Sequence, residues 1–470
     1  ESKYENDLIW VGSDDGLVHV SKNAGVTWEN ITPKRMPEWM MINSIEIDPF
    51  IKGGAYIVGT RYKMGDYRPY IYKTENYGKS WKLIINGIGN EDFTRALKAD
   101  PKRKGLLYLG TERGIYISFN DGKDWQQFQL NLPIVPITDL AIKNNNLIAA
   151  TQGRSLWIID DLAPLRQINK TLIKQDIILY KPQDAYRLRG GNGKISRTAG
   201  TNHFGGVAIN FYIKEKTEKD TVSLSIFDSD NNLVKKYSTW PDKVKKENEL
   251  KVKKGNNIFN WNMIYNGAKS VKGMILWWGS LSGPMALPGD YSVKLSVNKT
   301  TQSKGFKILR NPISEASDID MKAQFDFIND INTKITEIHI ALENVKKVRK
   351  QIILLKKSIS SKKEHKELFE FIDSLLKDMT KVEEKLYQTK SKSGQDPLNF
   401  PIRLNNKLAH INSLTRVGSY KPTQQEIDFK NEITEKIDYE LAKLYSLFNN
   451  QVKELNNKIK RSSIEFIEID

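Results

Sequence analysis

Apolar residues recur at two different periods along this 470-residue chain. Up to about residue 310, apolar and polar residues alternate over short stretches. These stretches are separated by Gly, Asn, Asp and Pro. Such alternation is typical of β-strands in small sheets. From about residue 313 the period becomes helical, with one apolar stripe from Phe325 to Leu342 and another from Leu368 to Val382. The pattern predicts a β-rich first part and a helical last part.

Strand and turn signals divide the chain into four parts, and the predicted fold class is multidomain β plus α. We expect β-propeller blades over residues 1–162, a linker over 163–180, an immunoglobulin-like β-sandwich over 181–312 and an antiparallel helical bundle over 313–470. The helices are predicted at about 316–357, 361–389, 402–416 and 422–460. In the sandwich, Trp277 and Trp278 are expected to form a buried edge or an inter-domain contact, and an exposed sugar platform is the alternative.

An eight-residue motif occurs three times in the first part, with Ser or Thr first, Asn third, Gly fifth and Trp eighth. Asn and Gly favour a tight hairpin because both tolerate a left-handed backbone, and Trp can pack beneath the hairpin. We therefore expect a structural role for the defining residues. These are Ser21, Asn23, Gly25, Trp28, Thr74, Asn76, Gly78, Trp81, Ser118, Asn120, Gly122 and Trp125.

A second periodicity has the same phase as the motif. Small residues end one strand of each repeat at Gly12, Gly59, Gly110 and Ala150, which are 47, 51 and 40 positions apart. This spacing is that of a four-stranded propeller blade. Only three to four blades fit into the first part, whereas propellers commonly close with more. We expect the remaining blades to precede residue 1 in the same protein or to belong to a companion chain.

Composition narrows the classes of function. The chain has no Cys, which excludes disulfides and thiol chemistry, and its net charge of +17 is spread along its length. The simplest interpretation of this charge is a generally basic surface. Binding to acidic glycans, lipopolysaccharide or nucleic acid is the alternative, and we expect no nucleic-acid partner. No apolar run is long enough for a transmembrane helix. The five scattered His predict no metal site, and the absence of a Gly-rich phosphate loop predicts no cofactor.

Several segments carry a family resemblance. They are the three motifs, Leu107–Trp125, Asn131–Leu140, Gly153–Leu162 and Ser393–Pro401. Together they resemble the C-terminal half of large bacterial BNR or Asp-box repeat proteins of Bacteroidetes type, which are similar to sortilin (VPS10) propellers and often labelled glycosyl hydrolases. Asn replaces the usual Asp of the motif, and Gln152 stands where His is expected before Gly-Arg. The resemblance implies a location outside the cytoplasm, in the periplasm, on the outer-membrane surface or secreted.

Loops between inner strands carry the charged residues that could form a site on a propeller face. The catalytic candidates are Asp14, Asp15 and Glu112, since a glycosidase needs two carboxylates roughly 5–10 Å apart. The ligand-binding candidates are Arg61, Asp66, Arg113 and Arg154. The leading hypothesis is a non-catalytic binding or scaffold protein that engages a polypeptide or glycan within a cell-envelope assembly. The alternative is a glycoside hydrolase of sialidase or glucanase type.

Overall fold

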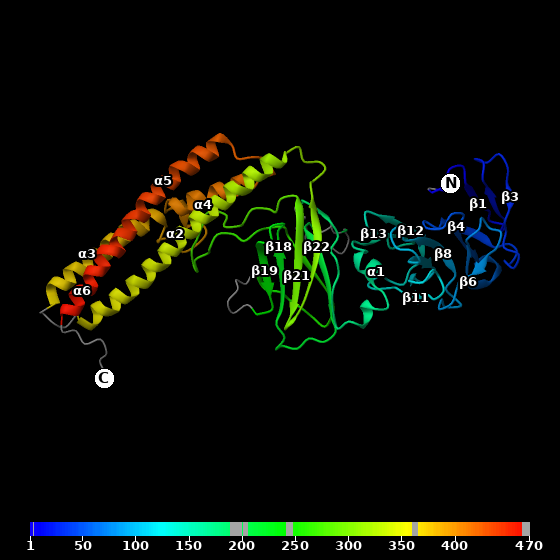
Figure 1. Cartoon of the computed structure of the whole chain (residues 1–470), viewed down its shortest axis with the longest axis horizontal. Helices are drawn as coiled ribbons and strands as arrows, with labels where there is room; N and C mark the ends of the chain where they lie inside the picture. Colours follow the sequence, from blue (N-terminus) through cyan, green and yellow to red (C-terminus); the bar gives the residue numbers. More distant parts are fainter. Residues whose placement is uncertain (3, 189–199, 201–204, 241–247, 360–364, 463–470) are drawn as a thin grey trace. The chain divides into compact units, whose positions relative to one another are not determined.

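The computed structural model describes residues 1–2, 4–188, 200, 205–240, 248–359 and 365–462 (Figure 1). It divides into two compact units, Glu1–Lys181 and Pro182–Asp470. Unit 1 is built of small sheets, whereas unit 2 combines further sheets with long helices, so the chain is mixed β plus α as predicted. The finer boundaries predicted at 162, 180 and 312 stay predictions. Among the described residues, no helix is both long and apolar enough to cross a lipid bilayer.

Unit 1 contains four antiparallel sheets that follow one another along the chain, each made of consecutive strands. The first sheet consists of β1 (Ile9–Gly12), β2 (Val18–Ser21) and β3 (Glu29–Asn30). The second consists of β4 (Met41–Ile47), β5 (Ala55–Arg61), β6 (Asp66–Thr74) and β7 (Lys82–Leu83). The third consists of β8 (Thr94–Ala99), β9 (Leu107–Thr111), β10 (Ile115–Ser118) and β11 (Gln126–Gln127). The fourth consists of β12 (Ile137–Lys143), β13 (Asn146–Thr151) and β14 (Leu156–Ile159), and α1 (Ala163–Gln167) follows.

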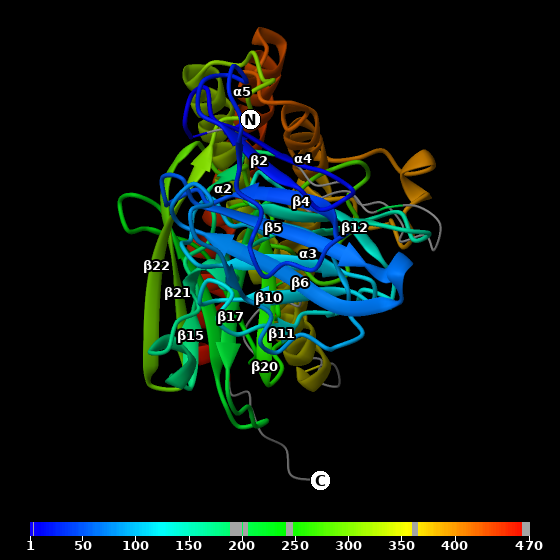
Figure 2. The same cartoon turned by 90° about the vertical axis from the view of Figure 1, so that its right-hand side faces the viewer.

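Consecutive antiparallel meanders of this size have the topology of propeller blades. Strand β4 contacts β8, and β8 contacts β12, so the first strands of successive sheets lie side by side (Figure 1; Figure 2 labels β4 and β12 from another side). The small residues of the repeat let the first strand of the next sheet approach the strands that carry them, β1 and β9. A Cβ atom on Gly12 would lie 2.5 Å from a side-chain carbon of Ile42, and one on Gly110 would lie 2.7 Å from Ile137. Glycine is required at these positions because the next sheet leaves no room for a side chain.

The three motif turns share one set of hydrogen bonds. In the first, the Ser21 hydroxyl accepts from the Gly25 N–H at 2.8 Å and donates to Asn23 Oδ1 at 3.0 Å, and Asn23 Oδ1 accepts from the Thr27 N–H at 2.9 Å. The other two turns repeat this arrangement. The left-handed residues are Gly and the residue before it, such as Ala24 at φ 54°. The expectation of a left-handed Asn was therefore wrong, because the Asn side chain serves as an acceptor for the turn backbone.

The motif Trp residues connect successive sheets. The Trp81 indole N–H donates to the Ile31 carbonyl at 2.7 Å, and the Trp125 indole N–H donates to the Ile84 carbonyl at 2.9 Å. Both carbonyls follow the last strand of the preceding sheet. The same isoleucines lie against the motif glycines, where any Cβ would collide with them. Trp28 belongs to the first sheet and is 45% exposed, whereas Trp125 is 5% exposed.

Unit 2 contains two sheets that pack face to face as a sandwich. Among the described residues of this unit, one sheet contains β17 and β20, and the other has the order β16-β22-β21-β18-β19. The strands are β16 (Ala185–Tyr186), β17 (Val207–Ile213), β18 (Val222–Phe227), β19 (Leu233–Ser238), β20 (Gly255–Trp261), β21 (Gly289–Val297) and β22 (Thr300–Leu309), and β15 (Ile177–Leu179) ends just before the unit boundary. Buried Trp261 of one sheet meets Tyr291 and Phe306 of the other, with ring centroids 5.8 and 6.2 Å away.

The helical part of unit 2 contains the four predicted helices, with the last one interrupted. They are α2 (Asp318–Ile359), α3 (Lys366–Leu386), α4 (Leu404–Thr415), α5 (Gln424–Ser446) and, after a π-helical turn (Leu447–Val452), α6 (Lys453–Arg461). Most of the two predicted apolar stripes, from Ile331 to Leu342 and from Leu368 to Val382, lies in the core between the helices, whereas Phe325 is half-buried against Tyr265. Helix α5 begins with a capping box, in which Thr423 and Glu426 satisfy each other's backbone N–H groups.

The bridging indoles make a stability prediction. We expect Trp125→Ala to lower the free energy of unfolding of unit 1 by about 3–5 kcal/mol, because a buried aromatic ring and an inter-sheet hydrogen bond are both lost. Trp28→Ala is the matched control in the same motif position and should cost less than about 1 kcal/mol because its ring is half exposed. Urea denaturation followed by circular dichroism measures both. Equal costs would contradict the bridging role of Trp125.

Candidate functional site

The predicted site residues lie in four equivalent links of unit 1. Each link joins the strand that carries the small repeat residue (β1, β5, β9 or β13) to the strand that follows it in the chain. Asp14 and Asp15 lie between β1 and β2, Arg61 and Asp66 at the β5–β6 link, Glu112 and Arg113 between β9 and β10, and Arg154 between β13 and β14. The β5–β6 link is longer than the others and contains a short 3-10 helix, Tyr62–Met64.

Arg61 and Asp66 meet at this longer link. The Asp66 carboxylate accepts from Arg61 Nη1 at 3.2 Å, from Arg68 Nε and Nη2 at 2.9 Å each, and from the Tyr70 hydroxyl at 2.7 Å. The hydrogen bonds from Arg68 are the main reason why the pKa of Asp66 lies well below its usual range. Burial and the hydrogen bond to Asp66 both raise the pKa of Tyr70. Asp66 is therefore a fixed anion at neutral pH.

Next to this link lies an aromatic and arginine layer that the sequence reading missed. Phe93, which precedes β8, stacks on Tyr62 with ring centroids 5.0 Å apart and contacts Tyr67 at 6.1 Å. The Arg95 guanidinium lies 5.1 Å from the Phe93 ring centroid and donates to Glu112 at 2.6 Å. Only two features of the sequence could have indicated this layer. They are the greater length of the β5–β6 link and the presence of Phe93 and Arg95 around the start of β8.

Arg113 meets the two acidic residues that precede Phe93 in the chain. It bonds Glu91 at 3.1 Å and lies 3.7 Å from Asp92, whose carboxylate also accepts from the Tyr116 hydroxyl at 2.5 Å. Burial, followed by this hydrogen bond, raises the pKa of Tyr116. We call the whole group the arginine–aromatic cluster. Its members are Arg61, Tyr62, Asp66, Tyr67, Arg68, Glu91, Asp92, Phe93, Arg95, Glu112 and Arg113.

The remaining candidates lie apart from this cluster. Asp15 accepts a hydrogen bond from Ser13 in its own loop, and both Asp14 and Asp15 are exposed. The contacts of the described residues include none between either of them and Glu112. Arg154 is exposed, and its backbone N–H donates to Thr151 Oγ1 at 3.1 Å. The structure thus brings Arg61, Asp66, Glu112 and Arg113 into one cluster without Asp14, Asp15 or Arg154.

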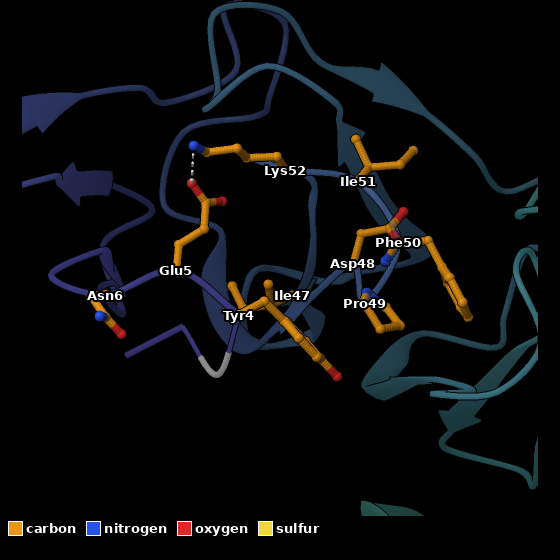
Figure 3. A pocket seen from close by; sticks show the side chains of 9 residues that line it. All are labelled: Tyr4, Glu5, Asn6, Ile47, Asp48, Pro49, Phe50, Ile51 and Lys52. Carbon is orange, nitrogen blue, oxygen red and sulfur yellow. Dashed lines mark hydrogen bonds and ion pairs between the residues drawn. The ribbon is translucent and has the colours of Figure 1, made fainter.

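A cavity of about 430 Å³ opens at the other end of β5, around the β4–β5 turn (Figure 3). Its lining includes Tyr4, Glu5, Asp48 and Lys52. The Glu5 carboxylate accepts from the Gly53 N–H at 2.8 Å and the Tyr77 hydroxyl at 2.7 Å, with Lys52 at 4.0 Å. Asp48 accepts from the Phe50 N–H and the Tyr56 hydroxyl. These carboxylates hold the N-terminal segment and the turn, so we assign the cavity a structural role.

Comparison with known proteins gives no family. No family model matches the chain, and no curated protein matches it. Among solved structures it is similar to YCF48 bound to D1 peptide (18% identity, 49% of this chain and 64% of that chain, TM-score 0.26). It is also similar to the GH74 xyloglucanase from Xanthomonas campestris (13% identity, 64% and 43%, TM-score 0.27) and to the computationally designed Ika4 protein (11% identity, 33% and 86%, TM-score 0.24). The chain spans less than two thirds of the first structures it matches, and likenesses this slight carry no argument about function.

The charge at Asp66 makes a pH prediction. We expect Asp66→Asn to lower the free energy of unfolding of unit 1 by about 1.5–3 kcal/mol near neutral pH, the range for hydrogen bonds to charged groups. Because folding lowers the pKa of Asp66 from 3.8, this stabilisation is present above that value and is lost as the pH falls through the folded-state pKa.

Urea titrations of the wild type and Asp66→Asn at about pH 7, 5 and 3 measure this difference. Asp14→Asn, an exposed aspartate in an equivalent link, is the control and should stay within about 0.5 kcal/mol of the wild type. A difference between the wild type and Asp66→Asn that grows as the pH falls would contradict the assignment.

Proposed function

We propose that this chain is a non-catalytic binding protein that acts outside the cytoplasm of a bacterium, and that the arginine–aromatic cluster engages a polypeptide. The observation that carries the proposal is the pairing of charges in the cluster. Asp66, Glu91, Asp92 and Glu112 each meet at least one arginine. The cluster therefore presents a fixed pattern of charge around exposed aromatic surface.

The composition of the cluster supports a polypeptide as the partner. Arg, Tyr, Phe and Met are enriched where proteins bind one another, and binding energy concentrates on Tyr and Arg held in place by their neighbours. Tyr67 is 52% exposed and Met64 is 61% exposed, next to the ordered Tyr62–Phe93 stack. Such preorganised side chains lose little entropy on binding. A glycan is the other partner compatible with the sequence-based hypothesis.

The same pairing argues against the glycoside hydrolase alternative. A glycosidase needs one carboxylic acid that is protonated near neutral pH and a second carboxylate across the bond. Hydrogen bonds lower the pKa of Asp66, and the Glu112 carboxylate is engaged in an ion pair with Arg95. The proposal also includes three expectations from the sequence: membership in a Bacteroidetes-type, sortilin-like Asp-box family, a place in a cell-envelope assembly, and additional blades. The charge pairing supports none of them directly.

A peptide selection tests the binding function. The full chain is used to select from a phage-displayed random peptide library. We expect enriched peptides whose affinity falls at least tenfold on Tyr67→Ala, since loss of one exposed aromatic anchor costs about 1.4 kcal/mol or more. Tyr186→Ala, a tyrosine of unit 2 with 50% exposure, is the matched control and should bind normally. Peptides that bind Tyr67→Ala as tightly as the wild type would refute the proposed site.

An activity assay tests the alternative. We expect the full chain to release no nitrophenol from nitrophenyl glucosides or sialosides above the blank. Hydrolysis that Glu112→Gln abolishes, while the circular dichroism spectrum stays unchanged, would establish the enzyme and overturn the non-catalytic proposal. Hydrolysis unchanged in Glu112→Gln would mean contamination or another site.

A further inference from the structure

The long segment between β20 and β21 in unit 2 carries the tandem Trp277–Trp278. Trp277 is half-buried, but Trp278 is 72% exposed, so the expectation of a buried edge does not hold for it. The two ring centroids lie 6.0 Å apart with an interplanar angle of 57°. Large aromatic side chains normally lose most of their surface to the protein interior, so the exposed Trp278 beside a half-buried Trp277 requires an explanation.

The backbone of Trp278 is in the left-handed region, at φ 55°. This conformation costs free energy for any residue with a Cβ, and for a bulky residue it is a true outlier. Gly or Asn would fold this position with less strain. A Trp that is both strained and exposed is not explained by folding, and strain of this kind is found at functional sites.

Helix α4 holds the backbone on both sides of the strained residue. Asn406 accepts from the Trp277 N–H at 2.7 Å and donates to the Trp277 carbonyl at 2.8 Å. Ser413 Oγ donates to the Trp278 carbonyl at 2.7 Å, and the Ser280 N–H donates to the Ala409 carbonyl at 2.9 Å. These four hydrogen bonds hold the backbone conformation in which the Trp278 side chain is exposed.

A second layer of buried polar residues supports the same segment. Asn332 of α2 and Asn412 of α4 both donate to the Ser282 carbonyl, at 3.0 and 3.1 Å, and Asn412 also donates to Asn332 at 2.9 Å. The His339 ring contacts the Lys269 carbonyl. Figure 1 shows α4 beside α2, the two helices that hold the segment. The donated hydrogen bonds of this layer tie the segment to two helices, although Asn412 Oδ1 itself is buried without a partner among the described residues.

We infer that Trp277 and Trp278 form a binding platform for a pyranose ring of a glycan. Both carbonyls of the pair and the N–H groups of Trp277 and Ser280 are already bonded within the protein, so the segment cannot use them to pair with an added peptide strand. What it offers is flat indole surface, with the Ser280 hydroxyl and the Arg416 guanidinium 2.9 Å apart beside it. A pyranose has an apolar C–H face and a rim of hydroxyls, which matches an aromatic surface bordered by polar groups.

A glycan array tests the inference on the full chain. We expect the wild type to bind a subset of immobilised glycans and Trp278→Asn to lose at least tenfold in affinity for them. Because Asn tolerates a left-handed backbone, the melting temperature of this variant should be unchanged or higher. Tyr439→Ala, an aromatic residue of α5 with 64% exposure, is the control and should keep normal binding.

The possible outcomes separate the alternatives. No bound glycan, or binding that survives Trp278→Asn, would overturn the platform. A lower melting temperature of Trp278→Asn together with normal glycan binding would show that Trp278 is structural. Binding to vesicles of anionic phospholipid, or to peptides, that only Trp278→Asn abolishes would assign the surface to a different class of partner and likewise refute the inference. The peptide selection on unit 1 is independent, because Tyr67→Ala leaves this segment intact.

Discussion

The arrangement of unit 1 depends on one hydrogen bond that recurs between sheets. The indole N–H of Trp81, and again of Trp125, reaches a backbone carbonyl after the last strand of the preceding sheet. A meander of three or four short strands cannot bury both of its faces alone. The two indoles join the first sheet to the second and the second to the third, while Gly12 and Gly110 leave room for the first strand of the next sheet. Together these contacts set the positions of the links that carry the arginine–aromatic cluster.

The cluster shows how the surroundings of a carboxylate decide its chemistry. Asp66 and Glu112 have the residue type that a glycosidase needs, but Arg61 and Arg68 bond Asp66 and keep it ionised, and Arg95 forms an ion pair with Glu112. The same arginines lie on or beside aromatic rings, which makes the surface rigid. A rigid surface with fixed charges suits recognition better than proton transfer.

Unit 2 uses helices to hold a segment of its sandwich. Three asparagines of α4 (Asn405, Asn406 and Asn412) are buried, although Asn is a poor residue for the interior of a helix. Their amides satisfy backbone groups of the segment that precedes β21 and contact groups on α2. This is why the sandwich and the helices form one compact unit, and why a strained Trp278 can persist on the surface.

Local chemistry in the sequence determined the elements. Alternation predicted strands, the helical period predicted α2 to α5, and the motif predicted three tight turns, since each depends on residues close together in the chain. Contacts between distant residues had to come from the tertiary structure. These include the Arg95–Glu112 pair, the Phe93–Tyr62 stack and the clamp of Asn406 on Trp277. The same reason explains why the exposure of Trp278 was not predicted, since it depends on a helix more than a hundred residues away. Asp14 and Asp15 share a loop type with Glu112 but not its contacts, and a role for them stays a prediction. Sequence spacing fixes which residues share a strand, a turn or a helix face, whereas the packing of those elements decides which side chains meet.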